Sequence, residues 1–222
     1  MKSTIKKQRQ AGFSTLELLV VVAMSLAITA IAVPSYTNIV AYLRAVGDVR
    51  ALNGITAQAK MRAAADFTHA RAYVNTTANT YHVEFWNKAG NGGAGCWQTD
   101  GDFANPCTAA GSPVQQLSQG VTFQPGSVTV GPTPGTASIH QAPLCLTKYA
   151  GSINNGTITS TACLEFNSRG IPVDSTNAPV PTGAIYLSNK NTVEAVTVSA
   201  TGSIRSWTTS PTCNSANCWH AQ

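Results

Sequence analysis

The sequence predicts an α+β protein in which a long N-terminal α-helix, transmembrane in its first half, packs on a C-terminal antiparallel β-rich head. Three patterns support this prediction. No charged side chain occurs from residue 18 to residue 43, and apolar residues then recur at helical spacing as far as Ala59. From about Arg71 onward, short alternating segments are separated by Gly, Pro, Asn and Ser.

The composition excludes a disordered chain and favours a protein that works outside the cytosol. Of the 222 residues, 43% are apolar and only 10% are charged, far below the roughly 25% of an average soluble domain. The net charge is +5, but four of the fourteen cations lie within residues 1–12, and without them the net charge falls to +1. Such a balance gives little support for a nucleic-acid partner.

The N-terminal apolar segment is long enough to cross a bilayer. Residues 1–12 are basic and contain no acid. The stretch from Phe13 to Val33 would form a helix about 31 Å long at 1.5 Å per residue, against a hydrocarbon core of roughly 30 Å. Because no cation follows the basic start until Arg44, we expect the start to stay cytoplasmic and the rest to be exported.

An acid, Glu17, lies near the start of this apolar segment. A secretory signal peptide has a shorter apolar core with a small-x-small cleavage site, and a plain membrane anchor has no use for an acid. An ionised carboxylate there costs about 2.5 to 3.5 kcal/mol on insertion scales, so we expect Glu17 to have a functional partner. A position at the level of the lipid headgroups is the simpler alternative.

Gly12, Phe13, Glu17 and Pro34, in this order and spacing, resemble the class III signal of type IV pilins and pseudopilins. The resemblance implies that a prepilin peptidase cuts between Gly12 and Phe13 and that the new amino terminus of Phe13 is methylated. It also implies that Glu17 accepts the terminal amine of an adjacent subunit. Pro34 matches the mid-helix proline of the family, where the missing backbone donor would kink or locally unwind the helix.

The resemblance divides the chain into four parts. These are a cleaved basic leader (1–12), a transmembrane and filament-core helix (13–34), an amphipathic helix that continues into the head (35–66) and a β-rich, disulfide-bonded globular head (67–222). We expect a single-pass protein of the bacterial inner membrane with its head in the periplasm. After assembly it would lie in a pilus or pseudopilus, periplasmic or at the cell surface.

The head has one helical face and several strands. The apolar face of the helix consists of Ile39, Leu43, Val46, Val49, Leu52, Ile55 and Ala59. The expected strands lie at Tyr81–Phe85, Val121–Phe123, Leu164–Phe166, Ala184–Leu187, Val193–Val198 and Ile204–Trp207. The last two would pair across Ala200–Gly202, with glycine where a positive φ is wanted.

The second half of the chain is similar to minor pilins of the GspH/FimT type. The similarity rests on a Phe-x-x-x-Gly at Phe166 to Gly170 and a Gly-x-x-Arg at Gly202 to Arg205. In some proteins of that type the last motif is Gly-Arg-x-Arg and is associated with DNA capture. Here Ser203 replaces the first arginine, so Arg205 is the remaining candidate DNA contact, and a hairpin with one solvated cation is the better supported alternative.

Six cysteines, all in the expected exported head, predict disulfides: Cys96, Cys107, Cys145, Cys163, Cys213 and Cys218. Fifteen connectivities are possible, and the sequence does not select one. Pairing of nearest neighbours would close three local loops. Zinc is disfavoured because the spacings contain no CxxC pair.

Nothing in the sequence favours an enzyme, a cofactor or a metal centre. The histidines have no catalytic partner at motif spacing. Asp100 and Asp102 lie two residues apart, which is too few ligands for Ca²⁺.

Two functions therefore remain open. The first is a minor pilin or pseudopilin, a structural subunit of a type IV pilus or a type II secretion pseudopilus, whose partners are other subunits, the prepilin peptidase and the inner membrane. The second is a filament-borne binding subunit on the same scaffold, for DNA uptake or adhesion.

Overall fold

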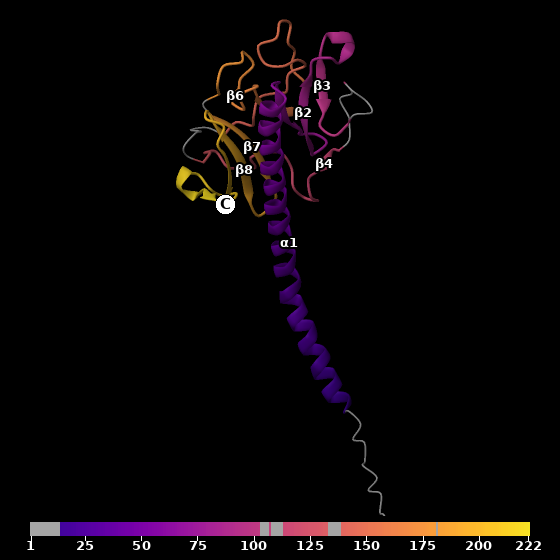
Figure 1. Ribbon diagram of the computed structural model, residues 1–222. Helices are drawn as coiled ribbons and strands as arrows, with labels where there is room; N and C mark the ends of the chain where they lie inside the picture. The colour runs from indigo at the N-terminus through magenta and orange to yellow at the C-terminus, as the bar shows by residue number, and fades with distance from the viewer. Residues whose placement is uncertain (1–13, 103–106, 108–112, 133–138, 181) are drawn as a thin grey trace, which may run out of the picture. The chain divides into compact units, whose positions relative to one another are not determined.

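The computed structural model describes residues 14–102, 107, 113–132, 139–180 and 182–222, so the expected cleavage site between Gly12 and Phe13 lies outside the described residues. The fold class is as predicted. One long helix, α1 (Thr15–Ala65), precedes a head built from antiparallel strands (Figure 1). Internal contacts divide the chain into a first unit, residues 1–40, and a compact second unit, residues 41–222, and α1 contributes to both.

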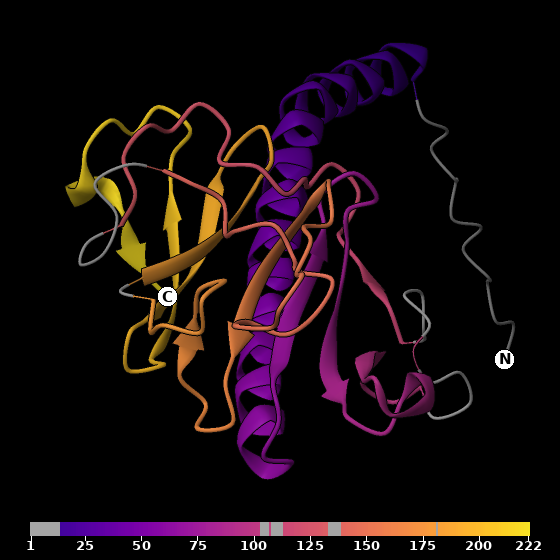
Figure 2. The same ribbon diagram turned by 90° about the horizontal axis from the view of Figure 1, so that it is seen from above.

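The second unit contains two antiparallel sheets (Figure 2). The first sheet has the order β3 (Cys96–Thr99), β2 (Thr80–Asn87), β1 (Ala70–Asn75), β5 (Thr161–Phe166) and β6 (Pro172–Val173), with β4 (Gln115–Gln116) paired to β2. The second sheet has the order β10 (His220–Ala221), β9 (Ile204–Thr209), β8 (Val193–Ser199) and β7 (Thr182–Ser188). Two single-turn 3₁₀ helices lie at Asn91–Gly93 and Ala216–Cys218.

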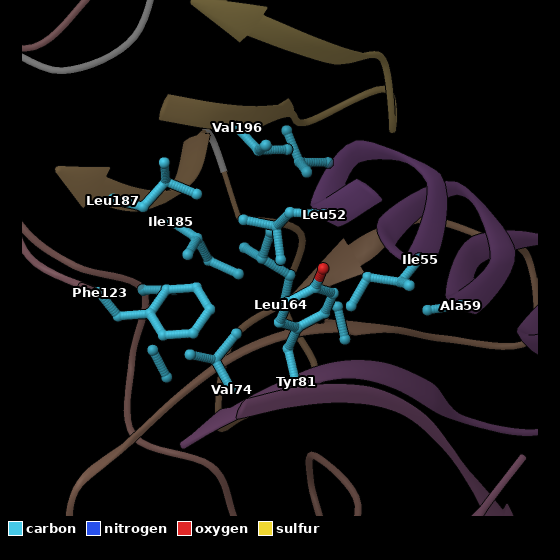
Figure 3. Packing of buried hydrophobic residues seen from close by; sticks show 14 of the residues in the cluster. Leu52, Ile55, Ala59, Val74, Tyr81, Phe123, Leu164, Ile185, Leu187 and Val196 are labelled. Carbon is cyan, nitrogen blue, oxygen red and sulfur yellow. The ribbon is translucent and has the colours of Figure 1, made fainter. Parts of the chain in front are cut away.

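The core forms where α1 meets both sheets. Leu52, Ile55 and Ala59 of α1 point toward the sheet side chains in Figure 3 and are at most 5% exposed. The first sheet contributes Val74 and Leu164 among others, and the second sheet contributes Ile185, Leu187, Val196 and Val198. Burial of one apolar face of a helix on a sheet is the usual source of helix stability in a small domain.

Two details differ from the expectations. Ile39 and Leu43 are more than half exposed, so the buried face of α1 begins only at Ala45. The segment Val121–Phe123 forms no strand; a single bridge joins Thr122 to Ser188. Backbone hydrogen bonds with Ser188 and an internal turn hold this segment instead, and both flanking apolar side chains are still buried.

The helix also continues through Pro34, where the resemblance implies a kink or local unwinding. Proline removes the one N–H that would bond the carbonyl of Ala30. The remaining i to i−4 bonds of an α-helix are enough to keep the flanking turns helical.

Three disulfides and one hairpin stabilise the head locally. The cysteines pair as nearest neighbours: Cys96 with Cys107, Cys145 with Cys163 and Cys213 with Cys218. The β8–β9 hairpin has Ile204 opposite Val198, and Gly202 in its turn has a φ of 75°. This is the connection predicted from the glycine in the turn.

Candidate functional site

The first candidate site is the apolar part of α1 in the first unit. It is the one helix within the described residues that is long and apolar enough to cross a membrane, and none of its most apolar window is buried. Leu16, Leu19 and Ile31 are each more than 65% exposed. A contiguous exposed apolar surface of this kind marks a site of contact with a membrane or with another protein.

Three hydroxyl groups of this segment are satisfied within the helix. The hydroxyls of Ser25, Thr29 and Ser35 donate to backbone carbonyls three or four residues earlier, at 2.6 to 3.3 Å. Such internal bonds are what a hydrocarbon environment demands of a spanning helix.

Glu17 lies in the first turn of α1, just after Ser14, whose hydroxyl accepts the N–H of Leu16 at 3.3 Å. A carboxylate is favoured at a helix N-terminus by the helix dipole. Among the described residues, no ion pair includes Glu17. The geometry leaves this carboxylate available to a cation from outside the described chain.

The two motifs that suggested the GspH/FimT type meet in the head. Gly170 and Gly202 adopt positive φ and lie against each other: a Cβ on Gly202 would be 2.8 Å from the carbonyl oxygen of Gly170. Lys60 of α1 donates its Nζ to the carbonyl of Gly202 at 2.8 Å. Both glycines are therefore explained by close packing around one lysine.

Arg205 lies in a shallow cavity of about 200 Å³ beside the β8–β9 turn. Hydroxyl side chains line it: Thr182, Thr197, Ser199, Thr201 and Ser203. Arg205 is exposed and forms no ion pair with an acid in the described part of the chain. The indole N–H of Trp207 donates to Thr197 Oγ1 at 2.8 Å and closes one side of the cavity. One cation among hydroxyls can hold an anionic oxygen.

Asp100 is engaged by α1, since its Oδ2 accepts from Gln58 Nε2 at 3.0 Å and its Oδ1 lies 3.4 Å from Arg62 Nε. Across the described residues, no group of three or more metal-ligating side chains comes together.

Sequence reasoning missed a buried charged cluster on the first sheet. Arg71 of β1 donates its Nε to Glu84 Oε2 at 2.6 Å, and His82 Nε2 lies 3.2 Å from Glu84 Oε1. Burial acts to raise the pKa of Glu84, but Arg71 and His82 outweigh it and hold that pKa below its usual range. A second acid of the first sheet, Glu165, lies 2.9 Å from His69.

The signal that could have found this cluster is the alternation along β2. Tyr81, Val83 and Phe85 face the core, which places His82, Glu84 and Trp86 together on the opposite face of the sheet. The sequence does not show which segment packs over that face. The structure shows that the segment after Cys145 does so, since the carbonyl of Leu146 accepts from Arg71 Nη1 at 2.5 Å.

Comparison with protein-family models, curated proteins and solved structures gives no match, so the functional argument depends on the sequence motifs and the geometry above.

Proposed function

We propose that this chain is a minor pilin or pseudopilin of the GspH/FimT type: a structural subunit that a prepilin peptidase processes and that enters a type IV pilus or a type II secretion pseudopilus. The observation that carries the proposal is the exposed apolar half of α1, with Glu17 in its first turn, joined to a disulfide-bonded head. In this proposal the subunit lies in the bacterial inner membrane before assembly, with its head in the periplasm.

The exposed apolar surface suits both proposed states of the subunit, anchored in the membrane and assembled in a filament. Before assembly, lipid would cover side chains such as Leu16 and Leu19, which are 71% and 67% exposed. After assembly, the corresponding helices of neighbouring subunits would replace the lipid, so the same residues serve as anchor and as filament core.

Glu17 would then be the assembly residue. In a filament its carboxylate would pair with the amine that cleavage creates on Phe13 of a neighbour. Removing one partner of a buried ion pair leaves an uncompensated charge, at a cost of about 3 kcal/mol or more. The pair would therefore act on assembly and not on membrane insertion.

The test is to express Glu17→Leu beside the wild-type protein and to measure its share in sheared filaments relative to its share in membranes. We expect the variant to be cleaved and inserted normally but to be strongly depleted in filaments. Glu17→Asp, which keeps the charge, is the matched control and should be depleted less. Equal incorporation of Glu17→Leu and wild type would contradict the pairing role.

A second function, binding of DNA by a filament-borne subunit, is favoured by one observation, the hydroxyl-lined cavity that contains Arg205. Each arginine that neutralises a phosphate releases about one counterion, so it adds about one to the slope of the logarithm of the binding constant against the logarithm of the salt concentration. If the cavity binds DNA, Arg205→Ala should weaken binding to a short duplex and lower the salt slope by about one. Arg50→Ala, which removes an exposed cation from α1, is the control.

A further inference from the structure

The face of the first sheet that points away from the core carries a row of aromatic and charged side chains. Core residues such as Ala72, Val74 and Val83 alternate with this row along β1 and β2. Its members are Arg71, Tyr73, His82, Glu84, Trp86 and, on β3, Trp97. We call this row the outer layer.

All members of the outer layer except His82 line a cavity of about 380 Å³. Tyr73, Trp86 and Trp97 supply ring surfaces, Arg71 and Glu84 supply charges, and Lys148 lines another wall. A second cavity of about 310 Å³ shares Trp86 and is lined by Phe67, His69 and Tyr149 among others. The sizes and the mixture of rings and a few fixed polar groups are typical of small-molecule sites.

The rings are held in fixed orientations. Trp86 packs edge to face on Trp97, with centroids 5.5 Å apart, and also on Tyr149, at 5.1 Å. Gly95 lies against the indole of Trp86, where a Cβ would be 2.6 Å from the ring. A preorganised aromatic surface loses little conformational entropy when a ligand binds.

Stability alone does not explain the buried charges of the outer layer. Arg71 is 1% exposed, pairs with Glu84 and stacks on the Trp97 ring at 3.9 Å. Apolar residues of similar volume would often stabilise a protein as well as a buried ion pair. Trp97 in addition has a buried indole N–H with no hydrogen-bond partner within the described residues. A ligand that accepts a hydrogen bond would satisfy such a donor.

We propose that the larger cavity binds a saccharide that carries a carboxylate, with Tyr73, Trp86 and Trp97 as its aromatic lining. A pyranose offers an apolar C–H face to aromatic rings and hydroxyls that both donate and accept, and the Trp97 N–H is a donor that such a hydroxyl would satisfy. The cavity has room for about one or two sugar rings.

The positive charge of Lys148 at the cavity favours an acidic sugar over a neutral one. Arg71 and Glu84 compensate each other, whereas Lys148 donates to the carbonyl of Ile153 and pairs with no acid in the described part of the chain. This leaves one positive charge at the cavity. A cationic ligand is disfavoured because Arg71 already occupies the cation position over Trp97.

The test uses the full chain in a polyoxyethylene detergent, since glycoside detergents would compete. A glycan array with neutral, amino and acidic sugars is followed by titration of the intrinsic tryptophan fluorescence with trigalacturonic acid, maltotriose and oligothymidylate. We expect acidic glycans on the array and saturable binding of trigalacturonic acid that is at least several-fold tighter than that of maltotriose.

Two variants locate the site. Trp97→Leu should weaken binding of trigalacturonic acid roughly tenfold or more, as loss of a central aromatic contact does. Lys148→Met, on the cavity wall, should weaken binding of the acidic sugar and leave that of maltotriose unchanged, with an unaltered thermal midpoint. Lys190→Met, an exposed lysine of the second sheet's β7–β8 loop, is the matched control and should change neither.

Three outcomes would overturn the proposal: no glycan bound on the array, oligothymidylate bound in place of saccharide, or acidic-sugar affinity unchanged in Lys148→Met. None of these readouts involves processing or filament assembly, so the result is independent of the proposed structural role.

Discussion

Glu194 makes the stability of the head depend on pH. Its side chain is fully buried in β8 and accepts hydrogen bonds from Thr208 Oγ1 and from Gln222 Nε2, both at 2.8 Å. None of the ion pairs in the described part of the chain includes it. Burial raises the pKa of Glu194 from 4.5 to about 7, although these hydrogen bonds act in the opposite direction.

A carboxyl whose pKa is raised by folding stabilises the folded state below its unfolded pKa, and this contribution is lost as the pH rises through the folded pKa. For Glu194 the window runs from 4.5 to about 7. One pKa unit corresponds to about 1.4 kcal/mol, so this carboxyl by itself should contribute about 3 kcal/mol less to the free energy of unfolding above pH 8 than near pH 4.5. Burial also raises the pKa of Asp48, against the hydrogen bonds from Ser118, and adds to the same trend.

Glu194→Gln isolates the contribution of this carboxyl. The amide stays neutral at every pH. Its oxygen accepts a hydrogen bond but its NH₂ group does not, so one of the two bonds is lost, at a cost of about 1 kcal/mol of stability. We therefore expect the variant to be slightly less stable than wild type near pH 5 and more stable near pH 8. Thermal unfolding followed by circular dichroism in nonionic detergent measures both. An identical pH dependence in the two proteins would refute the reasoning.

The other predictions concern packing and cross-links. Gly202→Ala should lower the free energy of unfolding by about 2 kcal/mol or more, because a Cβ would meet the carbonyl of Gly170 at a positive φ; Gly47→Ala, with open space around it, should raise it by about 0.5 to 1 kcal/mol. Leu52→Ala should cost about 2 to 5 kcal/mol because Leu52 is fully buried, whereas Leu43→Ala should have little effect on the detergent-solubilised monomer. Thiol titration of the unfolded, unreduced chain should find no free thiol, and two or more would contradict the three disulfides.

The helix and the hairpin could be predicted because their signals are local. Five of the apolar positions expected on α1, from Val46 to Ala59, are buried. The fully buried face begins at Ala45, because Ile39 and Leu43 are more than half exposed. Helical spacing alone does not show which turns of a helix are buried. Likewise, the spacing does not show that Asp48 is buried, because its carboxylate accepts from the N–H and the hydroxyl of Ser118, which is distant in the sequence.

The outer layer could not be predicted because it depends on contacts between distant segments. Arg71 meets Glu84 through strand pairing and Leu146 through the segment that packs over that face. The short β3 strand, which brings Trp97 opposite Trp86, follows a glycine-rich stretch that indicates only a loop. Arg205, in contrast, lies where the hairpin places it, and what the sequence did not show is the ring of hydroxyls around it.

The central claim is that this chain is processed as a prepilin and then built into a filament through its first helix. The most direct test is the intact mass of the protein purified from membranes of a host that contains a prepilin peptidase, beside Gly12→Val. We predict that the wild-type protein begins at Phe13 and carries one added methyl group, and that Gly12→Val keeps its full leader. A wild-type protein that retains residues 1–12, or a Gly12→Val protein that begins at a methylated Phe13, would contradict the account.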